Sequence, residues 1–234
     1  MIRLMLGYDD PQPIAFHVAA HSIHRNASEP VSITPVMLSQ LRHVFKRPRD
    51  PRQSTDFSFS RFLVPYLCDY EGWAIFADGD MVFRRDIAEL WKLRDDRYAV
   101  QVVKHDHVPE ESEKFLGHVQ TAYARKNWSS LMLLNNSRCR TLTPEYVHTA
   151  SGLDLHQFRW IDDDALIGAL PRWWNHLVDY DPSEPVERIA NLHYTTGGPW
   201  LPDYRRCGYA DAWLHELRQM TRPMSGADPA AGSG

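Results

Sequence analysis

The chain has 234 residues, enough for one substantial hydrophobic core, and its 43% hydrophobic content is typical of a folded globular protein. Its 26 basic and 30 acidic residues are mixed along the chain and give a formal net charge of -4, which excludes the strongly basic surface of a general nucleic-acid-binding protein. The three cysteines, Cys68, Cys139 and Cys207, are widely spaced without a zinc-binding pattern, so we expect buried, reduced thiols.

The chain alternates predicted strands and helices. In chain order, the first half predicts strand 2–7, a helix from Pro13, strand 31–38, a charged loop over 42–53, helix 57–70 and strand 73–77. The second half predicts helix 86–93, strand 98–104, an apolar run over 128–134, helix 162–170, strands 173–178 and 189–194, and helix 211–220. This alternation indicates a single α/β domain over residues 1–222, with a central, mainly parallel mixed sheet flanked by helices. Residues 223–234 are mostly Gly, Ala, Pro and Ser and predict a disordered tail.

The N-terminal segment MIRLMLGYDDPQP contains one Arg and a short apolar run that stops at acids and prolines. The run is too short for a membrane span and lacks a signal-peptide cleavage pattern. We therefore expect a cytoplasmic protein with no transmembrane segment, which can still touch a membrane face peripherally.

The stretch WAIFADGDMVF places two aspartates directly after a predicted strand. In an extended segment, carboxylates two residues apart point the same way, so Asp78 and Asp80 can both reach one cation while Gly79 lets the backbone bend. Oxygen ligands suit Mg²⁺ or Mn²⁺, and an added imidazole favours Mn²⁺. The same tripeptide also fits a solvated turn, although such a turn rarely lies inside so apolar a stretch.

The segment LHYTTGGPW begins inside the last predicted strand and continues beyond it. His193 could supply the imidazole, and Gly197-Gly198 could expose backbone amides that cradle phosphate oxygens. A histidine packed in the core, followed by a plain loop, is the alternative for this segment taken alone. Because ligands bind at the carboxyl ends of strands in open α/β sheets, its position near the aspartates and Asp9-Asp10 points to one site.

Four blocks of the sequence resemble the retaining GT-A-fold glycosyltransferases of the family 8 type. SRFLVPYLCDYEGWAIFADGDMVF is similar to their Arg-containing helix, strand and Asp-x-Asp pattern, and WSSLMLLN resembles their Asn-Ala-Gly-Val-Met-Leu-Ile-Asn strand. DDDALIGALPRWWN resembles Asp-Gln-Asp-x-Leu-Asn followed by Leu-Pro-x-x-Trp-Asn, and HYTTGGPW resembles His-Phe-x-Gly-x-x-Lys-Pro-Trp. The blocks occur in the family order and extend to about Trp200.

The resemblance implies a nucleotide-sugar donor, most often linked to uridine diphosphate (UDP) in that family, and a glycan or glycolipid acceptor, as in polysaccharide biosynthesis. It implies Asp78, Asp80 and His193 as ligands of Mn²⁺ or Mg²⁺. Tyr8 and Asp9 match positions that hold the nucleoside, and Arg61 matches a basic residue that faces the diphosphate and donor sugar. Asp162, with Asp163 in place of the family's Gln, matches the acidic pair near the donor sugar.

Two departures from the family pattern affect the expected site. The Lys before Pro-Trp is missing, so the Gly197-Gly198 amides, Lys104 or Arg125 would have to hold the leaving diphosphate. Trp128-Ser129-Ser130 replaces Asn-Ala-Gly, which removes an amide that normally faces the donor.

Transfer with retention passes through an oxocarbenium-like state that a nearby carboxylate can stabilise or attack. Asp162 is the candidate for this role, and a helix N-cap is its alternative function. Within three successive aspartates, the register remains open by one position.

Two other functions fit part of the pattern. Asp78-Gly79-Asp80-Met81-Val82 also fits the haloacid dehalogenase phosphatases, in which the first Asp is the nucleophile, but two predicted strands precede it here. A non-catalytic, metal-assisted sugar-binding module would need the metal and the aromatic residues but neither Arg61 nor Asp162.

Overall fold

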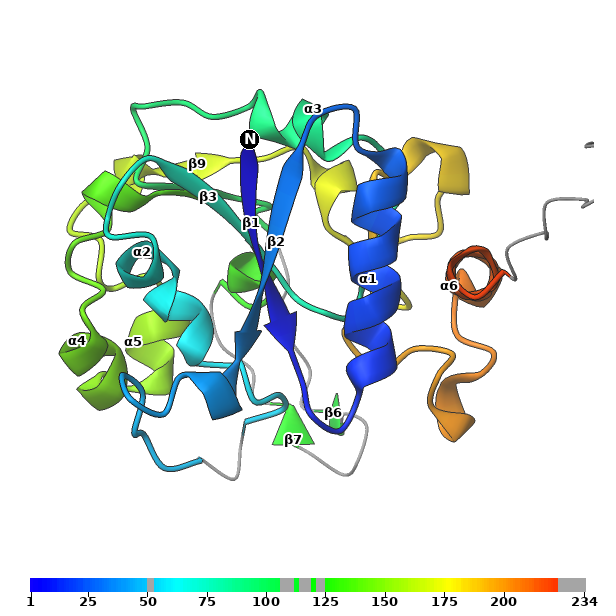
Figure 1. Cartoon of the computed structure of the whole chain (residues 1–234), viewed down its shortest axis with the longest axis horizontal. Helices are drawn as coiled ribbons and strands as arrows, with labels where there is room; N and C mark the ends of the chain where they lie inside the picture. The colour runs from blue at the N-terminus through cyan, green and yellow to red at the C-terminus, as the bar shows by residue number, and fades with distance from the viewer. Residues whose placement is uncertain (50–52, 106–111, 114–118, 121–124, 223–234) are drawn as a thin grey trace, which may run out of the picture.

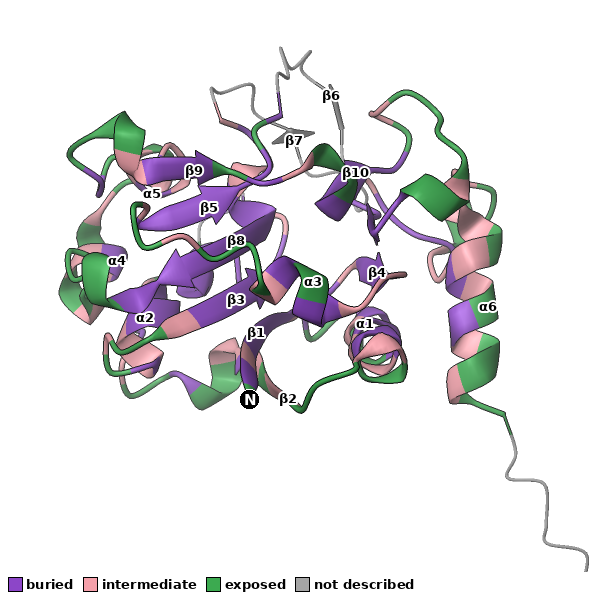
Figure 2. Cartoon of the chain, turned by 90° about the horizontal axis from the view of Figure 1, so that it is seen from above, coloured by how far each residue is buried: buried purple, intermediate pink, exposed green. Residues whose placement is uncertain are grey.

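A computed structural model describes residues 1–49, 53–105, 112–113, 119–120 and 125–222. Its centre is a six-stranded sheet in the order β2-β1-β3-β8-β5-β9 (Figures 1 and 2). These strands are β1 Ile2–Tyr8, β2 Val31–Met37, β3 Trp73–Ala77, β5 Val100–Val102, β8 Leu131–Asn135 and β9 Ile167–Ala169. β8 runs antiparallel to both neighbours, whereas the other pairs in this sheet are parallel. The predicted mainly parallel mixed sheet is confirmed.

A smaller three-stranded sheet continues from the end of β3. It has the order β10-β11-β4 and contains β4 Met81–Phe83, β10 His176–Leu177 and β11 Asn191–His193. β11 runs antiparallel to β4, and His193 pairs with Met81. The Tyr194 amide also donates to the Asp80 carbonyl at 3.0 Å. This pairing brings the end of β11 beside the turn that joins β3 to β4. β6 Ser112–Glu113 and β7 Val119–Gln120 form a separate antiparallel pair.

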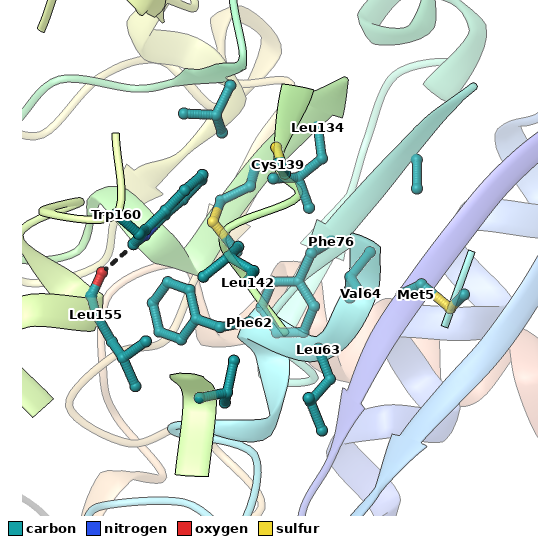
Figure 3. Close-up of a cluster of buried hydrophobic side chains, with 14 of the residues drawn as sticks. Met5, Phe62, Leu63, Val64, Phe76, Leu134, Cys139, Leu142, Leu155 and Trp160 are labelled. Atoms are coloured by element: carbon teal, nitrogen blue, oxygen red, sulfur yellow. Dashed lines mark hydrogen bonds between the residues drawn. The ribbon is translucent and has the colours of Figure 1, made fainter. Parts of the chain in front are cut away.

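Helices cover both faces of the central sheet (Figure 2). One side carries α1 Pro13–Asn26 and α3 Ile87–Trp91, with α6 Ala210–Met220 beside α1, and the other carries α2 Val64–Leu67, α4 Pro144–Thr149 and α5 Gly152–His156. Alternate residues of β3 face opposite layers: Phe76 packs in the cluster with the short helices, and Ile75 in the cluster with α1. Figure 3 shows Phe62, Phe76 and Leu142 meeting in the first of these clusters.

The helix predicted over 57–70 is wrong in its extent. A 3-10 turn, η2 Ser60–Leu63, leads into the single turn of α2. Pro65 lies in the first turn of α2, where its missing N–H is tolerated, but it cannot lie inside a longer helix. The chain then turns at Asp69 and Tyr70, which have φ of 54° and 56°, so the helix ends before them. Phe57, Phe59 and Phe62 are buried nonetheless, and Tyr66 and Tyr70 are half-buried.

The helix predicted over 162–170 is also wrong. The segment forms a 3-10 turn, η6 Asp164–Leu166, and then the edge strand β9, which pairs with β5. Gly168 explains part of this, since a Cβ there would lie 2.6 Å from the Tyr98 ring and 2.7 Å from Gln101 Cγ. A short apolar run does not distinguish a helix from a strand, and the backbone pairing with β5 decides the outcome.

Other predicted elements are confirmed with different bounds. Of the strand predicted over 173–178, only β10 is a strand; it follows a 3-10 turn, η7 Arg172–Trp174. Trp174 is buried, whereas Trp173 is 47% exposed. β4, α4 and α5 were not predicted. Within the described ranges, the remaining 3-10 turns are η1 Leu38–Gln40, η4 Trp128–Ser130, η5 Asn136–Arg138, η8 Val186–Arg188 and η9 Pro202–Tyr204.

All three cysteines are free thiols. Cys68 and Cys139 are buried as predicted, and Cys207 is half-buried. Burial raises the pKa of Cys139 to about 12, so its thiol is protonated at neutral pH. In the part of the chain that is described, no helix combines the length and apolar character needed to cross a bilayer. The tail over 223–234 lies outside the described residues.

Helix α6 lies beside α1 (Figures 1 and 2), and the buried Glu216 of α6 joins the two helices through charged hydrogen bonds. Glu216 is 2% exposed, accepts two bonds from Arg25 Nε and one from its Nη2 (2.7 Å), and lies 2.6 Å from His21 Nδ1. Burial acts to raise the pKa of Glu216, but the hydrogen bonds from Arg25 and His21 outweigh it and hold that pKa below its ordinary value.

We expect Glu216→Gln to lower the free energy of unfolding near pH 7 by about 1.5–3 kcal/mol, the usual contribution of hydrogen bonds to a charged group. Because the folded-state pKa of Glu216 is depressed, its ionisation stabilises the protein above the unfolded pKa and stops doing so as pH falls through the folded value. The difference between wild type and variant in urea unfolding should therefore shrink below about pH 4.3. A difference that stayed constant down to pH 3 would contradict this assignment.

Candidate functional site

Two aspartates and a histidine meet where β3, β4 and β11 converge. One carboxylate oxygen from each of Asp78 and Asp80 and one ring nitrogen of His193 lie within 4.8 Å of one another. Asp78 and His193 are buried, and Asp80 is half-buried. Among the residues that the structure describes, no other trio of His, Cys, Asp or Glu side chains is arranged in this way. The three residues predicted as metal ligands are thus brought together.

The backbone around Asp78 is fixed on both sides. Its amide donates to the Ser130 carbonyl at 2.9 Å, which continues the pairing of β3 with β8. Gly79 packs against β1 so closely that a Cβ would lie 2.2 Å from the Gly7 carbonyl oxygen. Glycine is therefore required at position 79 for close approach to the neighbouring strand. These backbone contacts within the sheet therefore set the directions of both aspartate side chains.

The ring of His193 is oriented by Asn175. His193 Nδ1 lies 3.0 Å from Asn175 Oδ1, while the Asn175 amide nitrogen donates to Ser130 Oγ at 2.8 Å and to Asn127 O at 3.4 Å. These partners fix the amide orientation, so Asn175 Oδ1 accepts and His193 Nδ1 carries the proton. This leaves Nε2 as the ring nitrogen that faces the aspartates, 3.4 Å from Asp80 Oδ1 and 3.8 Å from Asp78 Oδ2.

Arg61, which lies in η2, contacts the same cluster. Its Nη1 lies 2.9 Å from Asp78 Oδ1 and donates to the Ser129 carbonyl at 3.0 Å, and its guanidinium lies over the rings of Phe57 and Phe76. Arg61 is 6% exposed. The sequence predicted that it faces the diphosphate; the structure shows it in an ion pair with Asp78. It offsets one of the two carboxylate charges.

The donor set fits a hard divalent cation. Two carboxylates and one imidazole nitrogen converge, and the imidazole donates its other N–H to a side-chain carbonyl, as metal-bound histidines usually do. Mn²⁺ and Mg²⁺ both accept oxygen ligands, and the nitrogen favours Mn²⁺. The site is therefore a possible metal-binding site.

A pocket opens beside Asp80 towards β1. Its lining consists of Gly7, Asp9, Gln12, Ala15, Phe16, Thr55, Phe57, Gly79 and Asp80. Burial raises the pKa of Asp9, even though its carboxylate accepts from the Asp56 amide (2.9 Å) and from Gln12 Nε2 (2.8 Å). Tyr8 is half-buried and its ring contacts Phe16 edge-on. The predicted nucleoside residues thus lie at this pocket or next to it.

The glycine loop after β11 is tightly packed. A Cβ at Gly198 would lie 1.8 Å from the Trp200 ring, and one at Gly197 would lie 2.8 Å from the Tyr204 ring. The Gly197 amide donates to the Tyr194 carbonyl at 3.0 Å, so that amide is already used within the loop. Of the two amides predicted to cradle phosphate, the Gly198 amide is the better candidate.

The three aspartates before β9 have different roles. All of them are exposed. Asp163 caps η6 by accepting from the Ala165 amide at 2.9 Å, and Asp164 forms an ion pair with Arg125. The capping role considered for Asp162 therefore belongs to Asp163.

Lys104 and Arg125 both contact Trp128. Lys104 Nζ lies 5.6 Å from the Trp128 ring centre and Arg125 Cζ lies 5.5 Å from it, while the indole N–H donates to the His105 carbonyl at 3.1 Å. Lys104 follows β5, which lies beyond β8 from β3 and hence from Asp78. Both cations are thus on the opposite side of the aspartates from the Asp9 pocket.

Sequence reasoning missed several residues that shape the site. Asn175 is the last residue of the block DDDALIGALPRWWN. Its place in a block that resembles the family pattern was the signal that could have identified it. Gln12, Thr55 and Phe57 carry no local signal, because they reach the site through contacts between distant segments.

The architecture is that of the GT-A glycosyltransferases. The chain aligns with the bifunctional glycosyltransferase WbbM with a TM-score of 0.66 at 16% identity, covering 92% of this chain and 49% of that one. It aligns with an active-site mutant of LgtC with a TM-score of 0.62 at 12% identity, covering 96% and 98%. With GlyE of Streptococcus pneumoniae TIGR4 the TM-score is 0.60 at 14% identity, covering 92% and 60%. Identities this low show the fold alone.

Sequence similarity to a known protein shows the family of this chain. The chain is 44% identical over 227 residues to Protein CDI of Arabidopsis thaliana, and the alignment covers 94% of this chain and 87% of that protein. The chain therefore belongs to the family of Protein CDI. No family model matches it.

Asn175→Leu is expected to weaken Mn²⁺ binding about 10- to 100-fold, because it removes the hydrogen bond that sets the His193 tautomer and ring orientation. Mn²⁺ titration followed by electron paramagnetic resonance measures this directly. Asn136→Leu is the matched control, since Asn136 is equally buried but donates to Glu71 O near the opposite end of β3. Equal loss of affinity in both variants would show a general packing effect instead.

Proposed function

We propose that this chain is a metal-dependent glycosyltransferase that moves a sugar from a nucleotide-sugar donor, a UDP-sugar in the first instance, to a glycan or glycolipid acceptor. The observation that carries this proposal is the cluster of Asp78, Asp80 and His193 beside the Asp9 pocket in a GT-A fold. A nucleoside diphosphate needs both features, a place for its nucleoside and a cation for its phosphates. The proposal extends to a cytoplasmic enzyme of polysaccharide or glycolipid synthesis.

Asp78, Asp80 and His193 Nε2 would hold the Mn²⁺ or Mg²⁺. When bound, such an ion supplies the positive charge that stabilises a departing nucleoside diphosphate. Arg61 holds Asp78 in place through its 2.9 Å ion pair, and its bond to the Ser129 carbonyl ties this pair to the turn before β8. In this proposal Arg61 acts on the diphosphate through Asp78, and the Gly198 amide is a donor for a phosphate oxygen.

Tyr8 and Asp9 would bind the nucleoside at the β1 side of the cluster. The buried Asp9 carboxylate is oriented by the Asp56 amide and Gln12, so its acceptor positions are fixed before a ligand arrives. A fixed acceptor suits recognition of an N–H of a base or a ribose hydroxyl without an ordering cost.

Asp162 would stabilise the positive charge that develops at the anomeric carbon during transfer with retention. Asp163 caps η6 and Asp164 pairs with Arg125, so the neighbouring aspartates already have structural roles. A series of contacts links this turn to the metal ligands: Arg125 lies over Trp128, Ser129 follows Trp128, and the Ser129 carbonyl accepts from Arg61. Asp162 has neither of the two roles that its neighbours fill, and in this proposal it lies on the sugar side of the site with Asp163 beside it.

Asp80→Asn tests the proposal. We expect wild type to show Mn²⁺-dependent binding of UDP in calorimetry and slow Mn²⁺-dependent hydrolysis of some UDP-sugar in a donor panel. The variant keeps the size of the side chain but lacks one ligand charge. The UDP affinity and the rate of donor hydrolysis should therefore each fall by about 100-fold or more, as for loss of a group that stabilises developing charge. Unfolding temperature serves as the control for folding.

Two results would count against the proposal. Trapping of an acyl phosphate on Asp78 without nucleotide affinity would support a phosphatase of the haloacid dehalogenase type. Metal-dependent nucleotide binding without turnover of any donor, with or without glycan acceptors, would support a non-catalytic sugar-binding module.

A further inference from the structure

Gln12 connects two parts of the site that are far apart in the sequence. It directly precedes α1, is 8% exposed and lines the Asp9 pocket. Its amide is bonded at both ends: Nε2 donates to Asp9 Oδ2 at 2.8 Å, and Oε1 accepts from the Trp200 indole N–H at 2.9 Å. Both partners fix the orientation of the amide, since the carboxylate only accepts and the indole only donates.

At the first end, Gln12 holds the carboxylate that faces the pocket. Asp9 Oδ1 accepts from the Asp56 amide and Oδ2 accepts from Gln12, so the carboxylate is bonded at both oxygens. The backbone of this turn is also hydrogen-bonded, because the backbone N–H of Gln12 donates to the Asp9 carbonyl at 2.9 Å. Removing the Gln12 side-chain donor would release one oxygen of Asp9 and let the carboxylate rotate.

At the other end, Gln12 holds the loop that follows the metal ligand His193. The Trp200 ring packs on Trp213, with ring centres 5.2 Å apart, and fills the space over Gly198 that a Cβ would need. The loop starts at Tyr194, whose amide donates to the Asp80 carbonyl. The position of Trp200 therefore determines where the Gly198 backbone lies relative to Asp80.

We propose that Gln12 is a positioning residue that couples the nucleoside pocket to the glycine loop, through the path Asp9–Gln12–Trp200–Gly198. This inference rests on the proposed function. A nucleotide that seats against Asp9 would meet a phosphate-facing loop already held in place by the same amide. Because the metal ligands are held separately by β4, β11 and Asn175, the path should affect nucleotide affinity and leave the affinity for metal alone unchanged.

A purely structural role for Gln12 makes a different prediction, and the chain contains a matched control for it. Gln101 is 4% exposed and is also bonded at both ends, with Nε2 donating to Leu93 O at 2.8 Å and Oε1 accepting from the Asp95 amide at 3.0 Å. Trp73 provides the second control, since its indole N–H donates to Asp96 Oδ1 at the start of β3, away from Asp78.

The experiment compares Gln12→Met, Trp200→Phe and the double variant with the controls Gln101→Met and Trp73→Phe. Calorimetry measures the Kd of UDP at saturating Mn²⁺, paramagnetic resonance measures the Kd of Mn²⁺ alone, and thermal unfolding measures stability. Each single site variant should weaken UDP binding by about 5- to 30-fold, the effect of losing one buried hydrogen bond. The double variant should lie within about two-fold of the weaker single variant, because both changes break one path.

Mn²⁺ binding without nucleotide should stay within about two-fold of wild type in all variants, and the controls should keep UDP affinity even where their unfolding temperature falls. Loss of UDP affinity in Gln12→Met with none in Trp200→Phe would overturn the inference and make Gln12 a direct ligand contact. Losses of UDP affinity that add up in the double variant would overturn the inference as well. Control variants that lose as much UDP affinity as the site variants would also overturn it. A wild-type chain that binds no UDP with Mn²⁺ would remove the proposed function, and this inference with it.

Discussion

The site depends on the electrostatic repulsion between the carboxylates of Asp78 and Asp80. The sheet places two carboxylates beside one imidazole at the end of a buried strand, where the two like charges repel each other. Arg61 offsets the charge of Asp78, and the hydrogen bond to Asn175 turns His193 Nε2 towards the pair. A divalent cation at the point where the three side chains converge would offset the remaining carboxylate charge.

The fold enforces this arrangement through backbone contacts as much as through side chains. Gly79 has no room for a Cβ against the Gly7 carbonyl, and the pairing of β11 with β4 places His193 beside the turn. Asn175, from the segment between β9 and β10, connects His193 to the Ser130 hydroxyl, while the Ser130 carbonyl accepts from the Asp78 amide. Segments far apart in the sequence thus hold one ligand set, and the pocket lined by Asp9 opens at its edge.

The sequence predicted the strands that carry the site, because apolar runs such as 73–77 and 189–194 are local signals. It also predicted the ligand trio, because the two aspartates follow one strand, His193 lies at the end of another, and the family resemblance implies all three as ligands. It did not predict that Arg61 pairs with Asp78 or that Gln12 reaches Trp200, because such contacts depend on tertiary packing. The helices over 57–70 and 162–170 failed for related reasons: Pro65 and the left-handed Asp69 and Tyr70 confine the first, and pairing with β5 makes the second a strand.

The central claim is that Asp78, Asp80 and His193 bind a divalent cation that a nucleoside diphosphate shares. A crystal structure of the chain with Mn²⁺ and UDP, with anomalous data at the manganese edge, tests it most directly. The account predicts an anomalous peak within about 2.3 Å of Asp78, Asp80 and His193 Nε2, with the diphosphate against the ion and the nucleoside against Asp9. UDP bound elsewhere, or UDP in the pocket with no anomalous peak at the trio, would contradict it.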